Sequence, residues 1–516
     1  MDIRNMSLRE KALQTVVIRV DKDNFNPDKV GAAFFFGEII TDADEMGMEQ
    51  ARKTLRQYID NADIPILITS DFENGCGSML KGLTPLPYMM SLGATNSERL
   101  AYDYGKATAL EARSVGANWT FSPVSDLNIN PRNPLVNVRA LTDDPDLGVR
   151  LLTQVVKGMQ ENGLAACAKH FPGDGVDYRD QHMVTTHNSL PFEEWKQKHG
   201  KVFQALIDSG VYSIMAGHIT LPDYQTEIAP NGLPYPATLS KELITDLLKN
   251  EMGFEGVVVT DALGMGGFAG FYETKRKALI ESFKAGCDMM LWPSPEFVDD
   301  LVEAVENGYI PMERLDDAMT RILKMKEKLG LFKGDNHAVD LTAEQKAFVK
   351  KTQKDVAEHS ITLCKDKSGF FPLSPEKFRT VAVVPVTHHE PALAEAELLA
   401  RRLRERGFAV DLLRTVHQEE YDAHDLILFA LFSRPYRPIG FLDFQGEQAY
   451  KIARAVRHGH QKSLAVSFGS PYFGNQYYEK IPAYVNAYSM LSPSVEAFVR
   501  AACGDIPFGG FSPVKL

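Results

Sequence analysis

The sequence predicts an α/β protein with two domains: a TIM-type (β/α)8 barrel, followed by a smaller α/β sandwich with a mostly parallel sheet. Three observations lead to this prediction. The chain has 516 residues, which is comfortable for two domains. Short β-rich runs alternate with helical patterns through the first two thirds of the chain. After a polar stretch, the same alternation restarts on a smaller scale.

The strands expected in the first domain are short and several are almost wholly apolar, as strands buried on both faces should be. They are residues 16–20, 64–69, 119–123, 165–170, 213–218, 257–261 and 289–292. Repeated strand–helix units over this length suggest a (β/α)8 barrel, which usually needs roughly 250 residues or more. Because periodicity alone cannot separate the two folds, a doubly wound sheet is the alternative.

The helices expected between these strands are residues 97–115, 144–162, 240–252, 295–307 and 312–329. Asp144–Pro145 and Ser294–Pro295 each put a capping side chain before a proline that suits the first helical turn. Gly163, Gly253 and Gly308 stand where helices should end.

Residues 330–345, GLFKGDNHAVDLTAEQ, are rich in Gly, Asp and Asn and suggest a linker. The predicted domains are therefore 1–335 for the barrel, 336–350 for the linker and 351–516 for the sandwich. The strands expected in the second domain are residues 380–386, 409–413, 425–432, 464–469 and 483–488, and the helices include residues 392–406 and 447–458.

The composition indicates which kinds of partner and compartment suit the chain. Hydrophobic residues make up 44% and charged residues 24%, as in globular proteins. A formal net charge of −12 makes nucleic acid an unfavourable partner. We expect no membrane partner, because no apolar run is long enough to span a bilayer. The N-terminus has no secretory pattern, and the five cysteines form no CxxC pair. We therefore expect a reduced, cytoplasmic protein without a metal or other cofactor.

Ionisable side chains follow five consecutive expected strands, at the ends where parallel α/β folds gather their reactive residues. The exits carry Asp71 and Glu73; then Asp126, Asn128, Asn130, Arg132, Asn133 and Arg139; then Lys169 and His170; then His218; then Asp261. Scattered polar residues would not be confined to strand exits in this way.

The loop after Lys169–His170 is long, which is typical of functional loops in compact domains. Its Asp180-Gln181-His182 places a carboxylate and an imidazole two residues apart. A carboxylate that binds one ring nitrogen fixes the tautomer of the other, which makes a proton donor and acceptor near neutral pH. Asp261 ends an apolar run and is expected to point into the barrel mouth, near cations that keep it ionised.

These segments resemble glycoside hydrolase family 3, most closely its β-N-acetylglucosaminidase branch, whose bacterial members recycle cell-wall fragments. The family's Lys-His-Phe-Pro-Gly-His-Gly and Asp-Ser-His are similar to residues 169–175 and 180–182, and its Ser-Asp-Asp-Leu-x-Met to residues 260–265. Its Asp-Ile-Asn-x-Asn-Pro-x-Asn-Pro with a following arginine resembles residues 126–134 with Arg139, and its Asp-Gln-Glu-Gly-Gly resembles residues 71–75. Ser467-Phe468-Gly469-Ser470-Pro471-Tyr472 resembles the second domain of the longer members.

The resemblance implies a retaining glycosidase that removes terminal β-linked N-acetylglucosamine. Asp261 would be its nucleophile, and His182, oriented by Asp180, its acid/base. Asp71, Arg139, Lys169 and His170 would hold the sugar hydroxyls. Two departures stand out. Cys76-Gly77-Ser78-Met79 replace a stretch that carries an arginine in the family, which leaves the sugar open, and Asp174 replaces a histidine, which adds a negative charge near the site.

Several alternatives stay open. Within the family these are β-glucosidase or another β-glycosidase, and phosphorolysis, since an imidazole repels an incoming phosphate less than a carboxylate does. Outside it, a metal-dependent barrel hydrolase lacks the expected ligand spacing, and a sugar-binding protein would not need Asp261 and His182. Trp292 either stacks on a sugar face or belongs to the core. Residues 433–437 either border the site or cap the second sheet. The oligomeric state is not indicated.

Overall fold

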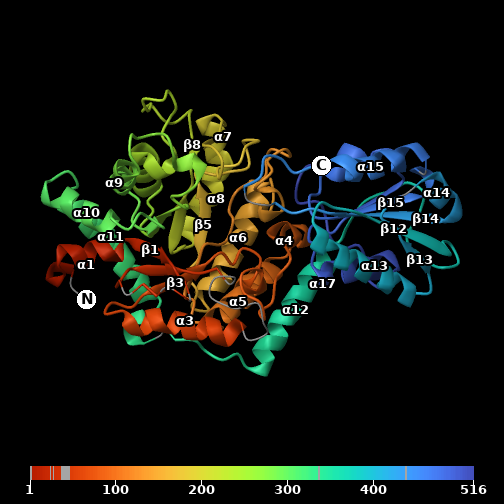
Figure 1. Cartoon of the computed structure of the whole chain (residues 1–516), viewed down its shortest axis with the longest axis horizontal. Helices are drawn as coiled ribbons and strands as arrows, with labels where there is room; N and C mark the ends of the chain where they lie inside the picture. Colours follow the sequence, from red (N-terminus) through yellow and green to blue (C-terminus); the bar gives the residue numbers. More distant parts are fainter. Residues whose placement is uncertain are drawn as a thin grey trace.

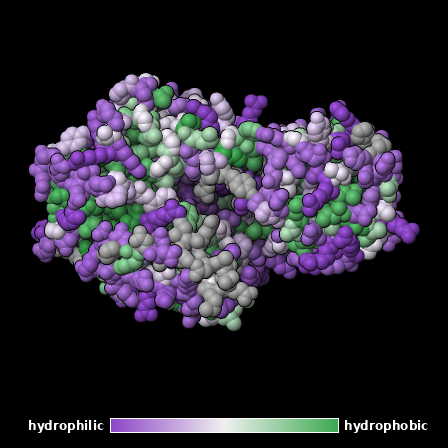
Figure 2. All heavy atoms as spheres, in the orientation of Figure 1, coloured by the Kyte–Doolittle hydropathy of each residue, from purple (hydrophilic) through white to green (hydrophobic). Residues whose placement is uncertain are grey.

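The computed structural model describes residues 3–21, 23, 25–26, 28–36, 47–334, 337–415, 417–435, 438–458 and 460–516. Its larger lobe holds the first two thirds of the chain and its smaller lobe the last third (Figure 1). Hydrophilic side chains cover most of the face shown in Figure 2. No helix among the described residues is long and apolar enough to cross a membrane.

The larger lobe is a (β/α)8 barrel, as predicted. In the described part of the chain its parallel strands are β1 (Val16–Arg19), β2 (Ala32–Phe34), β3 (Leu67–Ser70), β4 (Trp119–Thr120), β5 (Cys167–Phe171), β7 (Ser213–Ala216), β9 (Val257–Thr260) and β10 (Met290–Leu291). Pairing runs β10-β1-β2-β3-β4 and β5-β7-β9, and the parallel bridges Trp119–Ala165 and Val259–Met289 close the ring. The doubly wound alternative is therefore wrong.

The sequence does not reveal strand β2, because this strand has only three residues in the apolar run before Gly37. Each later strand is therefore one place further round the barrel than expected, and Asp71 follows the third strand.

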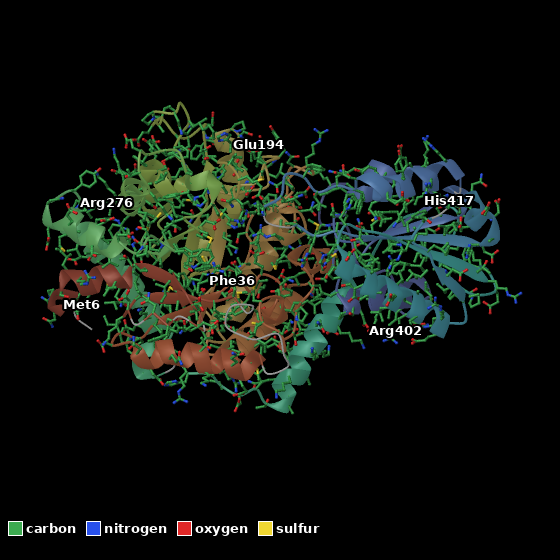
Figure 3. The ribbon with its side chains drawn as sticks, viewed as in Figure 1. Met6, Phe36, Glu194, Arg276, Arg402 and His417 are labelled. Atoms are coloured by element: carbon green, nitrogen blue, oxygen red, sulfur yellow. The ribbon has the colours of Figure 1, made fainter. Side chains whose placement is uncertain are left out.

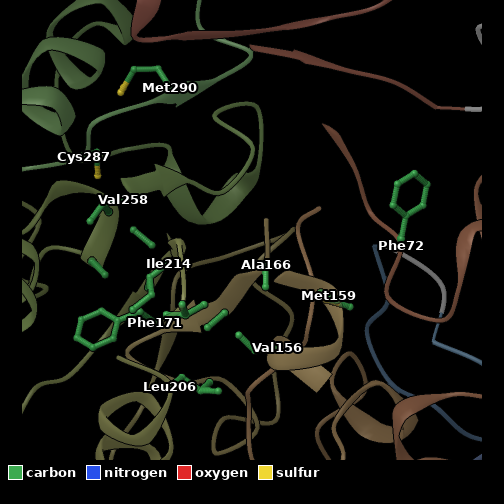
Figure 4. Packing of buried hydrophobic residues seen from close by; sticks show 14 of the residues in the cluster. Phe72, Val156, Met159, Ala166, Phe171, Leu206, Ile214, Val258, Cys287 and Met290 are labelled. Carbon is green, nitrogen blue, oxygen red and sulfur yellow. The ribbon is translucent and has the colours of Figure 1, made fainter. Parts of the chain in front are cut away.

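Successive residues along the strands alternate between the barrel interior and the surrounding helices, as the two-residue period of a strand requires. Cys167, Met215, Val257 and Val259 pack inside the barrel. Ala168, Ile214 and Val258 pack outward against the helices. Figure 4 shows part of this outer layer, in which Phe171, Ile214 and Leu206 lie close to one another.

The barrel helices are α1 (Leu8–Gln14), α3 (Gly47–Asn61), α4 (Met89–Thr95), α5 (Glu98–Ser114), α6 (Pro145–Gln160), α7 (Phe192–Gln197), α8 (His199–Asp208), α9 (Lys275–Ala285), α10 (Phe297–Glu306) and α11 (Met312–Lys328), with a π-helix over Glu242–Glu251. A short two-stranded sheet, β6 (Thr186–His187) and β8 (Ile219–Thr220), lies between β5 and β9 in sequence.

The predicted helix start at Asp144 is confirmed, because its carboxylate accepts from the N–H groups of Asp146 and Leu147. The start at Ser294 is wrong. Pro295 and Glu296 form a turn, and α10 begins at Phe297.

Helix α12 (Ala343–Ser360) joins the two lobes (Figure 1). Thr342 caps it, and its side chain accepts from the N–H of Gln345. Val349 and Val356 pack in the barrel's outer core, whereas Ala357 packs in the core of the second domain. The linker expected over 336–350 is therefore helical from Ala343 onward.

The smaller lobe is a mostly parallel α/β sandwich. Its strands are β11 (Thr362–Asp366), β12 (Thr380–Val386), β13 (Ala409–Leu412), β14 (Leu426–Phe432), β15 (Ser463–Phe468) and β16 (Ala483–Asn486), in the order β11-β16-β15-β14-β12-β13. Only β11, which the sequence did not reveal, is antiparallel among these. Its helices are α13 (Leu393–Glu405), α14 (Gln418–Ala423), α15 (Gly446–His458), α16 (Phe473–Tyr477) and α17 (Ser492–Ala502).

Strand β14 shows how the sandwich is built, since its side chains alternate between two cores. Leu428 and Ala430 pack toward α13 and α17, and Phe429 and Leu431 pack toward α15 and α16. A strand buried on both faces reads as a continuous apolar run, which is why its position was predictable.

The lobes meet through hydrogen bonds and through a buried apolar cluster, which is formed by Met90, Ala94 and Val138 with Tyr472, Tyr488 and Val514. The Nδ2 atom of Asn128 donates to the Tyr472 hydroxyl at 2.6 Å, and the hydroxyl of Thr142 donates to the carbonyl of Pro513 at 2.5 Å. The C-terminal segment thus returns to the barrel, and the C-terminus lies at the junction (Figure 1).

Candidate active site

The carboxyl ends of the barrel strands place the predicted side chains at one mouth of the barrel. Asp261 continues the inward-facing series Val257 and Val259, and Lys169 continues the inward-facing Ala165 and Cys167. By the same two-residue period, Asp71 points inward like Leu67, four residues earlier. Pairing of β5 with β7 is irregular between Ala168 and Phe171, and such irregularities re-aim side chains. Lys169 and His170 both border the cavity described next.

A cavity of about 500 Å³ occupies this mouth. Its wall includes six predicted site residues: Asp71, Lys169, His170, His182, Asp261 and Trp292. Asp180 lies behind His182, and Arg139 borders a neighbouring cavity of about 460 Å³ between the two domains. Asp71, Ser78 and Met79 belong to the walls of both cavities. The structure therefore brings all the predicted residues together.

Asp261 is a buried carboxylate that is surrounded by three histidines. Burial works against its charged form, but His170, His218 and His182 outweigh burial and lower the pKa of Asp261 to about 2. Its Oδ1 accepts from the N–H of Ala262 at 2.7 Å. Its Oδ2 lies 3.8 Å from His170 Nε2. Asp261 is therefore anionic at any ordinary pH.

His170 is fixed by Asp126 on its far side. Its Nδ1 donates to Asp126 Oδ2 at 2.8 Å, and its backbone N–H donates to Asp126 Oδ1 at 3.0 Å. The backbone N–H of Asp174 donates to the same Oδ1 at 2.7 Å. Asp126 therefore orients the imidazole toward Asp261 and holds the start of the next loop.

Asp174 is buried beside Asp126, which acts against the negative charge that the sequence suggested at this position. Burial, together with the nearby Asp126, raises the pKa of Asp174 to about 8. Its Oδ1 accepts from Asn133 Nδ2 at 3.1 Å and from the N–H of Gly175 at 2.6 Å. Burial and the charge of Asp126 therefore both favour the neutral form of this carboxyl group.

His182 and Asp180 form the predicted pair. His182 Nδ1 donates to Asp180 Oδ1 at 2.7 Å, which leaves Nε2 for a substrate. Burial acts to raise the pKa of Asp180, but the hydrogen bond and the charge of His182 outweigh it and lower that pKa. Asp180 therefore stays ionised and holds the imidazole in one orientation.

Two glycines let the loop of Asp180 and His182 pack directly on the loop that follows Asp261. The N–H groups of Gly266 and Gly267 donate to the carbonyls of His182 and Gln181, at 2.9 and 3.1 Å. A Cβ atom on Gly266 would lie 2.1 Å from the carbonyl oxygen of Met183. Only glycine permits this approach. The positions of His182 and Asp261 are therefore coupled through backbone contacts.

A buried ionic cluster forms the side of the site nearest the second domain. Lys169 Nζ lies 2.7 Å from both Asp71 Oδ1 and Glu73 Oε1. Arg139 binds Glu73 through two hydrogen bonds of 2.8 Å. Glu73, to which the sequence assigned no role, thus holds both cations. The cluster offers donors and acceptors at fixed positions, as recognition of sugar hydroxyls requires.

Trp292 lies on an aromatic wall of the cavity. It packs edge-on against Phe34, with ring centroids 5.2 Å apart, and 5.6 Å from Phe36. Figure 3 places Phe36 in the middle of the larger lobe. The guanidinium of Arg19 lies 5.0 Å from the Phe36 ring centre. Trp292 is partly buried and borders the cavity, so it combines the core role and the cavity-facing role that the sequence left open.

The remaining histidines have structural partners. His218 is fully buried; its Nε2 donates to the carbonyl of Ala262 at 3.0 Å, and its Nδ1 accepts from the hydroxyl of Thr238. His187 lies 2.6 Å from the Thr220 hydroxyl. Among the described residues, no three His, Cys, Asp or Glu side chains are grouped as metal ligands. Arg434 and Pro435 border the cavity between the domains, whereas Tyr436 and Arg437 lie outside the described residues.

Sequence reasoning missed the roles of Glu73, Asp126, Gly266 and Gly267. Glu73 and Asp126 both lie within the segments that resemble the family, but the sequence does not show which side chains they contact. The Gly266-Gly267 pair was a further signal, since adjacent glycines after a strand indicate a close backbone approach.

The fold and this mouth place the chain among the barrel enzymes that act on glycosidic bonds. Residues 7–325 match the family model described as Glycosyl hydrolase family 3 N terminal domain. The chain therefore belongs to glycoside hydrolase family 3.

Relatives with similar sequences are named for more than one activity. The chain is 32% identical over 498 residues to "Beta-N-acetylglucosaminidase/beta-glucosidase" of Cellulomonas fimi, covering 91% of this chain and 87% of that protein. It is 30% identical over 322 residues to "Beta-hexosaminidase A" of Pseudoalteromonas piscicida, covering 58% of this chain and 54% of that protein.

Solved structures are similar along the whole chain. "Beta-glucoside phosphorylase BglX bound to 2FGlc" superposes with a TM-score of 0.89 at 30% identity, covering 99% of this chain and 95% of that chain. A glycoside hydrolase family 3 β-N-acetylglucosaminidase from Paenibacillus sp. str. FPU-7 superposes with a TM-score of 0.83 at 27% identity, covering 99% of both chains.

Proposed function

We propose that this chain is a retaining β-N-acetylglucosaminidase that removes terminal β-linked N-acetylglucosamine. The single observation that carries the proposal is that Asp261 and His182 border one cavity, the first ionised and the second held by Asp180. The names of the Cellulomonas and Paenibacillus relatives support the sugar.

In the first step, an oxygen of Asp261 attacks the anomeric carbon while the bond from that carbon to the leaving oxygen breaks. Oδ2 is the better placed of the two oxygens, because Oδ1 already accepts from Ala262. The protonated Nε2 of His182 gives its proton to the leaving oxygen. General acid help of this kind contributes roughly 10²–10⁴-fold.

In the second step, water attacks the same carbon and the bond to Asp261 breaks. Nε2 of His182 now takes the proton from water, so the enzyme returns to its starting state. Two inversions give net retention of configuration. Asp180 stabilises the imidazolium whenever His182 carries both protons.

The remaining residues hold the sugar. Asp71, Arg139, Lys169 and His170 supply charged donors and acceptors for hydroxyl groups, and Trp292 supplies an aromatic face. Phe34, Phe121 and Met215 make part of the cavity apolar, which suits the methyl group of an acetamido substituent.

A panel of aryl N-acetylglucosaminide, glucoside, xyloside and galactoside tests the sugar. We expect the highest kcat/KM on the N-acetylglucosaminide; preference for the glucoside would make the chain a β-glucosidase instead. A slowly hydrolysed fluoroglycoside, followed by peptide mass spectrometry, should place the covalent sugar on Asp261. Attachment to another residue would overturn the assignment.

Phosphorolysis is a second candidate, in which phosphate replaces water in the second step. It is supported by the likeness to the phosphorylase BglX along nearly the whole chain. It is also supported by His182, because a neutral imidazole repels an incoming phosphate less than a carboxylate does. Turnover with and without inorganic phosphate, with detection of a sugar 1-phosphate, distinguishes the two. A phosphate-dependent rise in rate with that product would favour the phosphorylase.

We further propose that the natural substrate is an N-acetylglucosamine-containing oligosaccharide or cell-wall fragment that the enzyme meets in the cytoplasm. All five cysteines are free of disulfides, which suits a reducing compartment. Fractionation of cells that make the protein tests the compartment, and incubation with purified cell-wall fragments tests the substrate. Enzyme found only outside the cytoplasmic fraction would contradict the first proposal.

A further inference from the structure

The second domain reaches the acid/base pair through one backbone group. Asp180 is 2% exposed, and its two carboxylate oxygens have different partners. Oδ1 accepts from His182, through Nδ1 at 2.7 Å and the backbone N–H at 2.9 Å. Oδ2 accepts from the backbone N–H of Ile439 at 2.8 Å. Ile439 lies 259 residues further along the chain, in the second domain.

We propose that the N–H group of Ile439 is a positioning group for catalysis, through which the second domain holds Asp180 and, through it, the His182 ring. This inference rests on the proposed role of His182 as acid/base. The N–H of Ile439 donates to Asp180, which carries no reacting atom, and so Ile439 acts on the reaction only by positioning the His182 ring.

The segment that carries Ile439 is fixed to its own domain. Phe444 is 7% exposed and packs against Phe473, with ring centroids 4.7 Å apart. The N–H of Gln445 donates to His388 Nε2 at 2.9 Å. Ile439 therefore belongs to a segment that is anchored in the sandwich domain, whereas Asp180 belongs to the barrel. The hydrogen bond between them makes the orientation of His182 depend on how the domains are docked.

The chemistry explains why one N–H matters. Donors on both oxygens favour the ionised form of a buried carboxylate and hold it in one orientation. His182 and its backbone supply the donors of Oδ1 only. Among the described residues, Ile439 supplies the one hydrogen bond to Oδ2. Without it, the carboxylate can rotate about its side chain, and Nδ1 of His182 loses its fixed partner.

The sharpest test removes that N–H and keeps the side chain. Replacing Ile439 by its α-hydroxy analogue turns the preceding amide into an ester, so the donor is lost while the side chain stays. Ile439→Pro also removes the donor and is simpler to make. Ile439→Val is the matched control, because it keeps the N–H and a β-branched side chain. Thermal unfolding of each variant establishes that it is folded.

The readout is the dependence on leaving group. We expect the ester variant to lose about tenfold in kcat/KM on an aryl glycoside with a poor leaving group. The loss of one hydrogen bond to a charged group is large enough to change a rate or equilibrium constant by about that factor. The loss should be under about twofold on a dinitrophenyl glycoside, whose leaving oxygen needs no proton. Ile439→Val should match the wild type. Equal losses on both substrates, or none in the ester variant, would overturn the proposal.

Two comparisons keep this test separate from the proposed function. His182→Ala must itself show a loss that depends on leaving group; if it does not, the proposed function fails, whatever happens at Ile439. In an Asp180→Asn background, removal of the Ile439 N–H should change the rate on the poor substrate by less than about twofold, because coupled groups are not additive. A full tenfold effect in that background would show that Ile439 acts by another route.

Discussion

Nε2 of His170 faces Oδ2 of Asp261 at 3.8 Å, while Nδ1 of the same ring donates to Asp126 at 2.8 Å. Two carboxylates thus lie on opposite sides of one imidazole. Among the neighbours that lower the pKa of Asp261, this ring has the largest effect. It keeps the proposed nucleophile ionised although the side chain is almost wholly buried.

Asp261→Asn should lower kcat on an aryl N-acetylglucosaminide by at least about a thousandfold, because the amide cannot form the covalent intermediate. Steady-state kinetics measures the loss. Asp299→Asn, at an exposed carboxylate on α10, is the control and should leave kcat unchanged. Activity near the wild-type value in Asp261→Asn would mean that another group attacks the sugar.

His182→Ala should lose about 10²–10⁴-fold on substrates with poor leaving groups, because no proton reaches the departing oxygen. The loss should be far smaller for a dinitrophenyl leaving group. A plot of rate against the leaving-group pKa measures this difference as a steeper slope in the variant. An unchanged slope would exclude His182 as the general acid.

Asp174→Asn should reduce the pH dependence of stability. The pKa of Asp174 is raised by burial and Asp126, with Arg139, Asn133 and the Gly175 N–H opposing. Between its unfolded and folded pKa values the folded state binds more protons, so wild-type stability should fall as the pH rises from about 5 to about 8, by at most about 1.4 kcal/mol per pH unit from this group. Asparagine does not titrate.

Thermal unfolding across that pH range tests this prediction. The Tm of Asp174→Asn should fall less than that of the wild type. Equal falls would mean that Asp174 is already ionised in the folded protein.

Glu73→Gln should destabilise the protein by about 3 kcal/mol, since it leaves Arg139 and part of the charge of Lys169 without a buried counterion. The KM should also rise, because both cations are proposed sugar ligands. Urea unfolding measures the first effect. The control is Glu98→Gln, whose surface pair with Arg150 spans 3.3 Å and should be worth under about 1 kcal/mol. Equal costs in the two variants would contradict the prediction.

Gly266→Ala should push the acid/base loop away from the loop of Asp261, because its Cβ atom would lie 2.1 Å from the Met183 carbonyl oxygen. A displacement of about 1 Å can cost about 100-fold in rate, and the loss should be greatest on poor leaving groups. Gly509→Ala is the control, since the atom nearest to its added Cβ would be 3.8 Å away. Full activity in Gly266→Ala would show that the loop can shift to accept the added methyl group without displacing His182.

Much of the fold followed from local patterns. Strands β12 and β14, buried on both faces, appear as continuous apolar runs, and α6 was bounded by Asp144 and Gly163. Strand β2 was missed because three residues give no period, and β11 because its burial alternates weakly at a sheet edge. The start of α10 was misplaced because a proline after a serine also suits a turn.

The sequence by itself determined which residues are proposed for the chemistry, because Asp261, His182 and Lys169–His170 stand in or just after strand ends, within segments that resemble the family. Their common cavity, the raised pKa of Asp174, the Glu73 cluster and the hydrogen bond from Ile439 to Asp180 were decided only by the tertiary structure. The physical reason is distance along the chain. Burial and charge act between residues that meet in space, and a local pattern holds no record of which distant groups meet.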